Sequence, residues 1–275
     1  LKLGEQTVYI DTGDPMHDGF NAVIMIEDVN IVGCQVSGDR GQEDEFIEIT
    51  EPATPWQNVR VIGEDIVATE LILPENHRIR HVDVGAMLAG GHIDVKVRKR
   101  PRVVIIPTGT EIVEPGTSLK KGDIIEYNSR VLGGLVSEWG GEPVRFRIIR
   151  DNVEELKDAI LEAHKIGDMI IINAGASAGS EDFTSKAISE TGEIIFHGVS
   201  IKPGKPVIAG IIRNKPVLGI PGYPVSAFIT FNLFAKPVVY KWQGMEMCPP
   251  DILQAVLSRQ VASTLGHEEF LRVKI

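Results

Sequence analysis

The sequence predicts an α/β protein: a mostly parallel sheet domain with helices on both faces, flanked by β-rich regions. From Arg102 onward, apolar runs alternate with longer segments of helical periodicity, which is typical of βαβ units. The run from Met169 to Ile172 is apolar without polar alternation, as expected of a strand that helices cover on both faces. Before Arg100, short runs separated by Gly, Pro and Asp turns indicate small β-rich units.

Four regions follow from this pattern. Residues 1–58 form a β-rich region, 59–100 a second small β-containing region, 101–244 the α/β domain, and 245–275 the start of a C-terminal β domain. Candidate strands in the first two regions are Thr7 to Ile10, Ala22 to Ile26, Phe46 to Ile49, Val59 to Ile62, Ile66 to Leu73 and Ile93 to Val97. The run from Val82 to Ala89 fits either a short helix or a strand.

Bulk properties narrow the class of protein. A chain of 275 residues with 43% hydrophobic content is long enough for two or three domains. The net charge of −10 and the pI near 5.2 argue against non-specific binding of nucleic acid, so small ligands or proteins are the expected partners. Cys34 and Cys248 have no metal-ligand spacing, which favours a reducing cytoplasm. No apolar run approaches the roughly 20 residues of a membrane span.

The segment after Ile149 has clear signals for a helix. Asp151 is the predicted N-cap, with Glu154 three residues later as in a capping box. His164 and Lys165 suit the negative end of the helix, and Gly167 stops it. The predicted apolar stripe consists of Val153, Leu156, Ile160 and Ala163.

The loop after the run Met169–Ile172 is the first candidate for ligand binding. Gly175 and Gly179 allow a positive φ or a close approach of backbone to ligand. The segment from Ser180 to Asp182 can cap a following helix, and such a junction offers backbone N–H groups to an anion. Taken alone, this loop is better explained as an ordinary βα turn, since loops of small residues are common.

Several unusual segments share one position in the predicted fold, since TGTE, Arg150-Asp151, AGASAGSED, KPGKP and PGYPVS each follow a predicted strand. Segments at the carboxyl ends of strands line a common crevice in an open α/β sheet. This crevice would hold Glu111, Asp151 and Asp182 beside Lys202 and Lys205, the composition of a phosphate site that also binds Mg²⁺. Each piece alone fits a helix cap or a turn. No nucleotide-binding or hydrolase fingerprint is present.

These segments also carry a family resemblance. TGTEI, Tyr127-Asn128 with its helix, RDNVEEL, INAGASAGSEDF, IKPGKPV and PGYPVSAFITF resemble, in order and spacing, the signature segments of the molybdopterin molybdenumtransferase family, which comprises bacterial MoeA and the E domain of gephyrin. Residues 10–15 and 22–27 are similar to its β-rich region, and 268–273 to the start of its C-terminal β domain. The resemblance implies a domain of the molybdopterin-binding type at 101–244, and further residues before Leu1 and after Ile275.

The resemblance implies a reaction and a set of site residues. The family ligates molybdate into the dithiolene of adenylylated molybdopterin and releases AMP with Mg²⁺ present. Glu111, Asp151 and Asp182 would then be catalytic, with Glu111 and Asp182 also binding the metal. The expected ligand-binding residues are Thr108, Gly109, Gly175, Ser177, Gly179, Lys202, Gly204, Lys205, Pro221, Gly222 and Ser226. The family implies a homodimer that brings Thr12, Gly13 and Glu27 to the partner's site, and a molybdopterin adenylyltransferase as a candidate partner.

Six positions depart from the family pattern: Asn21, Thr110, Ala174, Ala176, Gly198 and Tyr223. Two of the departures remove an acid and one removes a lysine, which leaves open a catalytically weakened molybdopterin-binding or delivery protein. A related adenylyltransferase is the third hypothesis, and the additional β-rich regions argue against it. The sequence does not distinguish molybdate from tungstate, since both are tetrahedral dianions of similar size.

Overall fold

The computed structural model describes residues 1–37, 42–174, 180–247, 252–263 and 265–274. The side chains of residues 34–37, 42–44 and 180–182 lie outside this description, and so do both cysteine side chains. The chain divides into two compact units. One comprises Leu1–Leu73 and Arg80–Ile93, and the other comprises Pro74–Ile79 and Asp94–Ile275.

The first unit contains little regular structure. Strands β1 (Val29–Ser37) and β2 (Gln42–Ile49) form an antiparallel hairpin whose register shifts between Ile31 and Gly33. The 3₁₀-helix η1 (Ile26–Asp28) precedes this hairpin, and helix α1 (His81–Ala89) lies later in the unit. The predicted strand at Phe46 to Ile49 is therefore confirmed, and the run from Val82 to Ala89 is a helix.

Other strand predictions before residue 100 were wrong. The runs 59–62, 66–73 and 93–97 contain no strand, although each is apolar. Several of their large side chains, including Ile62, Leu71 and Ile93, are exposed. An apolar run forms a strand only where a neighbouring segment pairs with its backbone N–H and C=O groups, and the described residues provide no such partner for these runs.

The second unit is built on a six-stranded sheet in the order β6-β3-β7-β11-β10-β8. Strands β6, β3, β7 and β11 run parallel, while β10 is antiparallel to both of its neighbours. The predicted mostly parallel sheet is thus confirmed. Its strands are β3 (Arg102–Pro107), β6 (Glu142–Arg145), β7 (Met169–Asn173), β8 (Glu193–His197), β10 (Ile208–Ile212) and β11 (Lys215–Ile220).

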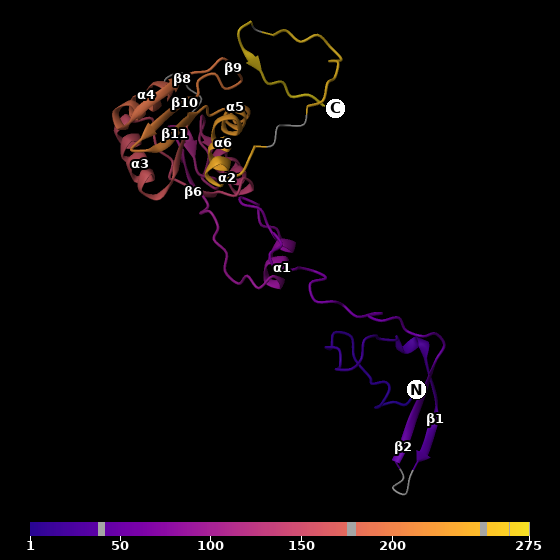
Figure 1. The fold of residues 1–275 in the computed structure, drawn as a ribbon. Coiled ribbons are helices and arrows are strands. Elements are labelled where there is room, and N and C mark those ends of the chain that lie inside the picture. Colours follow the sequence, from indigo (N-terminus) through magenta and orange to yellow (C-terminus); the bar gives the residue numbers. More distant parts are fainter. Residues whose placement is uncertain (38–41, 175–179, 248–251, 264, 275) are drawn as a thin grey trace. The chain divides into compact units, whose positions relative to one another are not determined.

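Helices cover both faces of this sheet (Figure 1). Alternate strand residues point to opposite faces, so Val103 and Ile105 pack in one core cluster and Val104 and Ile106 in the other. The helices on the first face are α2 (Asn128–Glu138), α5 (Pro224–Thr230), the π-helical turn η2 (Phe231–Ala235) and α6 (Lys236–Trp242). Helices α3 (Val153–Ile166) and α4 (Ser180–Thr191) cover the second face.

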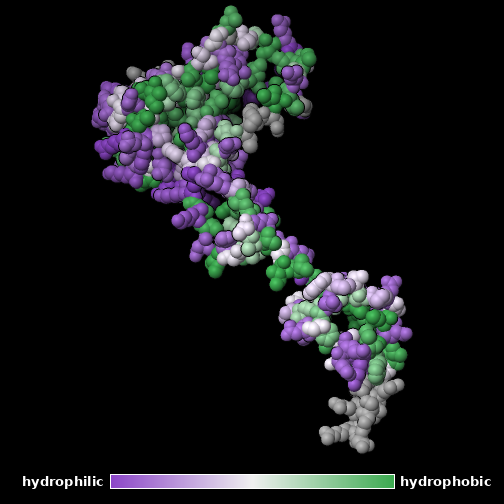
Figure 2. Space-filling model, viewed as in Figure 1, coloured by the Kyte–Doolittle hydropathy of each residue, from purple (hydrophilic) through white to green (hydrophobic). Residues whose placement is uncertain are grey.

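Helix α3 corrects one prediction at its start. Its N-cap is Asn152, whose side-chain oxygen accepts hydrogen bonds from the backbone N–H groups of Glu154 at 2.9 Å and Glu155 at 3.1 Å. The predicted capping role of Asp151 was wrong because Asn152 lies one residue nearer the helix and reaches both N–H groups. The predicted stop at Gly167 is confirmed. Hydrophilic residues occupy the outer surface over α3 (Figure 2).

Two short parallel pairs lie beside the main sheet. Strand β4 (Ile112–Val113) pairs with β5 (Ile124–Ile125), and β9 (Ile201–Lys202) pairs with β12 (Glu268–Glu269). Strands β10 and β11 form a hairpin around Arg213 and Asn214, both of which have positive φ. In the part of the chain that the structure describes, no helix is long and apolar enough to cross a membrane.

Candidate active site

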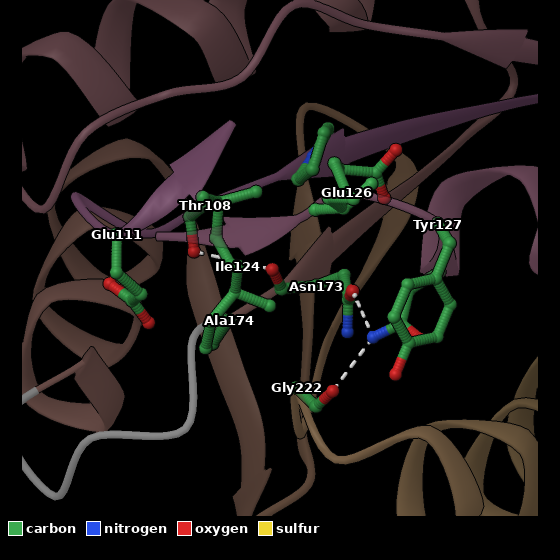
Figure 3. A pocket seen from close by; sticks show the side chains of 12 residues that line it. Thr108, Glu111, Ile124, Glu126, Tyr127, Asn173, Ala174 and Gly222 are labelled. Carbon is green, nitrogen blue, oxygen red and sulfur yellow. Dashed lines mark hydrogen bonds between the residues drawn. The ribbon is translucent and has the colours of Figure 1, made fainter. Parts of the chain in front are cut away.

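The loops at the carboxyl ends of β3, β7 and β11 border a small hollow (Figure 3). Its volume is about 60 Å³, whereas pockets for drug-sized ligands measure about 300–1,000 Å³. The hollow is therefore large enough for only one part of such a ligand. It is lined by Pro107, Thr108, Glu111, Ile112, Ile124, Ile125, Glu126, Tyr127, Asn128, Asn173, Ala174 and Gly222.

The end of β3 is held against the end of β7. The backbone N–H and the hydroxyl of Thr108 donate to the carbonyl of Asn173, at 2.9 and 3.3 Å. Gly109 follows at φ 143°, and a Cβ there would lie 2.6 Å from Cγ1 of Ile112 and 3.2–3.3 Å from the carboxylate of Glu111. Only glycine fits this position, which leaves the Glu111 carboxylate packed over the backbone at one end of the hollow.

An amide bridge joins the three loops. Nδ2 of Asn128 donates to Oδ1 of Asn173 at 3.0 Å and to the carbonyl of Gly222 at 2.7 Å. Nδ2 of Asn173 in turn donates to the carbonyl of Pro221 at 2.9 Å. These hydrogen bonds fix the start of α2 to the ends of β7 and β11. Sequence reasoning did not assign Asn128 or Asn173 to the site; an Asn closing an otherwise apolar run was the available signal.

The buried carboxylate of Glu126 holds the first turn of α2, which carries Asn128 of this bridge. The side chain of Glu126 is only 3% exposed. It accepts hydrogen bonds from the backbone N–H and the hydroxyl of Ser129 and from Nη1 of Arg130, each at 2.7 Å. Nη2 of Arg130 extends the network to Glu114 at 3.0 Å. A buried charge is tolerated where several donors satisfy it, so Glu126 anchors the first turn of α2 and with it Asn128.

Asp151 lies outside the lining of the hollow but is attached to its rim. Its Oδ2 accepts from the backbone N–H and the hydroxyl of Thr110, both at 3.3 Å. The same hydroxyl lies 3.4 Å from the backbone N–H of Asp151, which donates to it. The structure thus joins the TGTE and RD segments, which the sequence placed in one crevice.

The lysines of KPGKP are exposed and do not line the hollow. Nζ of Lys202 lies 3.4 Å from a carboxylate oxygen of Glu269, and β9 and β12 hold the two residues opposite each other. Gly204 has φ 114°, and a Cβ there would lie 2.5 Å from Cγ2 of Thr230. Lys205 and Ser226 are also absent from the described lining, whereas Gly222 belongs to it.

The remaining predicted site residues fall where the structure is not described. Gly175, Ala176, Ser177 and Gly179 lie outside the described residues. Asp182 belongs to α4 by its backbone, and its side chain lies outside the description. Their predicted roles stay predictions.

Among the described residues of the hollow, one carboxylate is suitable for binding Mg²⁺ together with substrate phosphates. No group of three His, Cys, Asp or Glu side chains arranged for a metal occurs among the described residues. Mg²⁺ keeps several waters and is commonly held by one or two carboxylates together with substrate phosphates. Glu111 meets that requirement, because in the described part of the chain its carboxylate has no hydrogen-bonding or ionic partner.

Comparison with known families defines the class of this domain. Residues 104–241 match the family described as a probable molybdopterin binding domain. Residues 1–91 match the MoeA N-terminal region, domains I and II. The chain belongs to the MoeA family, the molybdopterin molybdenumtransferases.

Individual relatives agree with this assignment. The molybdopterin molybdenumtransferase of Haemophilus influenzae is 30% identical over 269 residues, which are 98% of this chain and 64% of that protein. A protein assigned to molybdopterin biosynthesis in Methanocaldococcus jannaschii is 33% identical over 288 residues, which are 100% of this chain and 67% of that protein. The chain thus spans about two thirds of the length of these curated relatives.

Two crystal structures of the molybdopterin biosynthesis MoeA protein from Pyrococcus horikoshii share the fold. One is 38% identical with a TM-score of 0.67, and the match covers 82% of this chain and 53% of that one. The other is 32% identical with a TM-score of 0.62, and it covers 87% of this chain and 55% of that one.

Proposed function

We propose that this protein inserts molybdate into adenylylated molybdopterin and releases AMP in a Mg²⁺-dependent reaction. The observation that carries the proposal is the hollow at the carboxyl ends of the parallel strands. There the Glu111 carboxylate, which has no partner among the described residues, lies across from the Asn128–Asn173–Gly222 bridge. Membership of the molybdenumtransferase family supports the reaction, and the position at the strand ends supports the site.

The reaction requires hydrolysis as well as metal ligation. Water adds to a phosphorus atom of the adenylate, one P–O bond of the diphosphate breaks, and AMP leaves with the electron pair of that bond. The two dithiolene thiols lose their protons as the sulfurs bind the molybdenum, and one oxygen of the oxyanion takes up these two protons and leaves as water. A bound Mg²⁺ would neutralise charge that develops on the phosphate oxygens.

The residues of this chain divide the work of binding and orientation. Glu111 and Asp182 would hold the cation, and Asp151 would help to orient the reacting groups, with Thr110 fixing its carboxylate. Lys202 and Lys205 would contact the anionic parts of the substrates. The amide bridge keeps the three loops in fixed positions, which is how a rigid scaffold promotes a reaction between separate groups.

The assay of AMP release from adenylylated molybdopterin tests these roles. Asp182→Asn preserves the volume and the capping ability of the side chain but removes the charge that a hard cation requires. We expect the far-UV circular dichroism spectrum to be retained while Mg²⁺-dependent AMP release falls. Equal rates and equal Mg²⁺ dependence in wild type and Asp182→Asn would show that the reaction does not need the charge of Asp182.

The lysines are tested by binding. Substituting Lys202 and Lys205 with alanine should weaken binding of adenylylated molybdopterin, while the free energy of unfolding changes by roughly 0–1 kcal/mol because the side chains are exposed. Unchanged affinity in the double variant would remove both residues from the site.

The proposal includes assembly and location. We expect a cytoplasmic homodimer in which Thr12, Gly13 and Glu27 of one subunit approach the site of the other. A molybdopterin adenylyltransferase would supply the adenylylated substrate and is the protein partner we expect. Sedimentation at micromolar concentration tests the dimer, and a monomer would contradict it.

One observation favours a second function, the binding and delivery of molybdopterin without turnover. Thr110 stands where the family has an acid, and its hydroxyl engages Asp151. The segment thus contributes one carboxylate fewer for holding a cation. Binding of adenylylated molybdopterin without any release of AMP would favour delivery over catalysis.

A further inference from the structure

One wall of the hollow is apolar although it faces solvent. Ile124 and Ile125 of β5 are 45% and 40% exposed, and Tyr127 is 47% exposed. All three line the hollow. In the part of the chain that the structure describes, the Tyr127 side chain has no hydrogen bond, ring contact or cation contact. An aromatic face left open at the mouth of a pocket is a typical surface for a flat ligand.

The amide bridge beside Tyr127 offers a ligand hydrogen-bond acceptors, because its described side-chain donors already bond to protein oxygens. Both described hydrogen bonds from Nδ2 of Asn128 go to protein oxygens, and the amide of Asn173 and the hydroxyl of Thr108 also donate to carbonyls. Within this bridge, two acceptors are left for a ligand: Oδ1 of Asn128 and the second lone pair of the Gly222 carbonyl. No lysine or arginine is among the described residues that line the hollow. These features fit a neutral ring with N–H groups on its edge better than a phosphate.

We propose that Tyr127 stacks on the pterin ring of the substrate and that the aminopyrimidine edge of this ring donates to Asn128 and Gly222. This inference rests on the proposed function, since it assigns one end of the same substrate. The edge enters the hollow, and the ring plane lies at its mouth against Tyr127. The anionic end then extends toward Glu111, which lies on the opposite side of the hollow from Tyr127 in Figure 3.

The hydrogen-bonding edge distinguishes the two rings of the substrate. A pterin carries an amino group and a ring N–H side by side, which matches two neighbouring acceptors. Adenine carries one amino group flanked by ring nitrogens that accept, so one acceptor of the protein would face another acceptor. A buried acceptor without a donor is unfavourable. The pterin is therefore the ring assigned to Tyr127.

Binding of the separate halves of the substrate tests this assignment. The probes are 6-hydroxymethylpterin, which has no phosphate, and AMP, each titrated into the wild-type protein and its variants by calorimetry. Tyr127→Ala should weaken binding of the pterin by about 5- to 100-fold, the range found when a stacking aromatic is removed. Tyr127→Phe keeps the ring and should bind within about twofold of wild type. Affinity for AMP should not change.

Tyr223 provides the matched control. It is a neighbouring tyrosine, 65% exposed, that does not line the described hollow. Tyr223→Ala should therefore leave binding of the pterin unchanged. Equal losses in Tyr127→Ala and Tyr223→Ala, a loss for AMP alone, or no binding of the pterin to wild type at millimolar concentration would each overturn the inference.

The outcome is separable from that of the proposed reaction, because pterin binding needs neither molybdate nor Mg²⁺. A protein that binds the pterin through Tyr127 but releases no AMP refutes the reaction and retains this inference. If the wild-type protein releases AMP and Tyr127→Ala binds the pterin as tightly as wild type, this inference is refuted and the proposed reaction is not.

Discussion

Thr110 and Asp151 lie 41 residues apart in sequence and hold each other through one hydroxyl group. The Thr110 hydroxyl donates to the carboxylate of Asp151 and accepts from its backbone N–H. This contact joins the loop after β3 to the start of α3, so the threonine that replaces the family's acid has a structural role. It also orients the Asp151 carboxylate, which does not cap the helix.

Removing the Thr110 hydroxyl should weaken the attachment of Asp151, which would keep only the hydrogen bond from the Thr110 backbone N–H. Thr110→Val deletes both hydroxyl contacts and should lower the free energy of unfolding by about 0.5–1.5 kcal/mol. Thr110→Ser retains the hydroxyl and should lie close to wild type. Urea denaturation measures both variants. Equal losses in the valine and serine variants would show that the methyl group of Thr110, and not its hydroxyl, matters.

Because Asn152 caps α3, a substitution at Asn152 should lower the free energy of unfolding more than one at Asp151. Asn152→Ala removes the acceptor for two backbone N–H groups and should cost about 0.5–2 kcal/mol of unfolding free energy. Asp151→Asn keeps an acceptor for Thr110 and should cost less than Asn152→Ala. Thermal or chemical unfolding checks the order. A larger loss from Asp151→Asn would mean that Asp151 caps the helix after all.

Substitution of the buried Glu126 should lower the free energy of unfolding more than substitution of the exposed Glu114. Glu126→Ala leaves the Ser129 N–H group and hydroxyl without their acceptor and removes one acceptor of Arg130, which should cost about 1–3 kcal/mol. Glu114→Ala is the control, because Glu114 binds the same arginine from an exposed position, and it should cost at most about 1 kcal/mol. Similar losses in both variants, measured by urea denaturation, would contradict the anchoring role of Glu126.

Two ion pairs on α3 should make stability depend on acid pH. The Lys157 ammonium, 2.8 Å from Glu190, holds the pKa of that carboxyl below its usual value of 4.5, and Arg147 lowers the pKa of Glu162 in the same way. A lowered carboxyl pKa in the folded state stabilises the protein above the unfolded pKa. This stability is lost as pH falls through the folded pKa, which is below about pH 5.

Glu190→Gln tests this pH dependence. The variant should be less stable than wild type at pH 7, and the difference should shrink as the pH falls below about 5. Melting temperatures across this range provide the measurement. In a Lys157→Met background the same substitution should show no such pH-dependent gap. A gap that persists unchanged at pH 3 would exclude the ion pair as its cause.

Much of the sheet could be predicted because the local patterns and the tertiary environment agree. The apolar runs at β3, β7 and β11 are buried on both faces, so their composition reports their position directly. Strand β6, Glu142–Arg145, is harder to recognise because it lies at the edge of the sheet. Its four residues are half-buried or exposed, so the apolar signal of this strand in the sequence is weaker.

The site was harder to predict because its contacts are distant in sequence. Asn128 reaches Gly222 across 94 residues and Asn173 across 45, and nothing local marks such a pair. The position of Glu126 was equally hidden, because an acid before a helix is normally exposed. Glu111 was predictable, since it follows a strand whose end must lie at the crevice. Asp151 was predicted to cap α3, but the N-cap is the adjacent Asn152, and the Asp151 carboxylate accepts from Thr110 instead.

The central claim is that this chain couples molybdate to the release of AMP. The most direct measurement incubates wild-type protein, Mg²⁺ and adenylylated molybdopterin with and without molybdate, and quantifies AMP by chromatography over time. We predict that AMP accumulates over several turnovers with molybdate, that little forms without it, and that chelation of Mg²⁺ stops its release. Bound substrate with no AMP in either sample, or AMP release that is indifferent to molybdate, would contradict the claim.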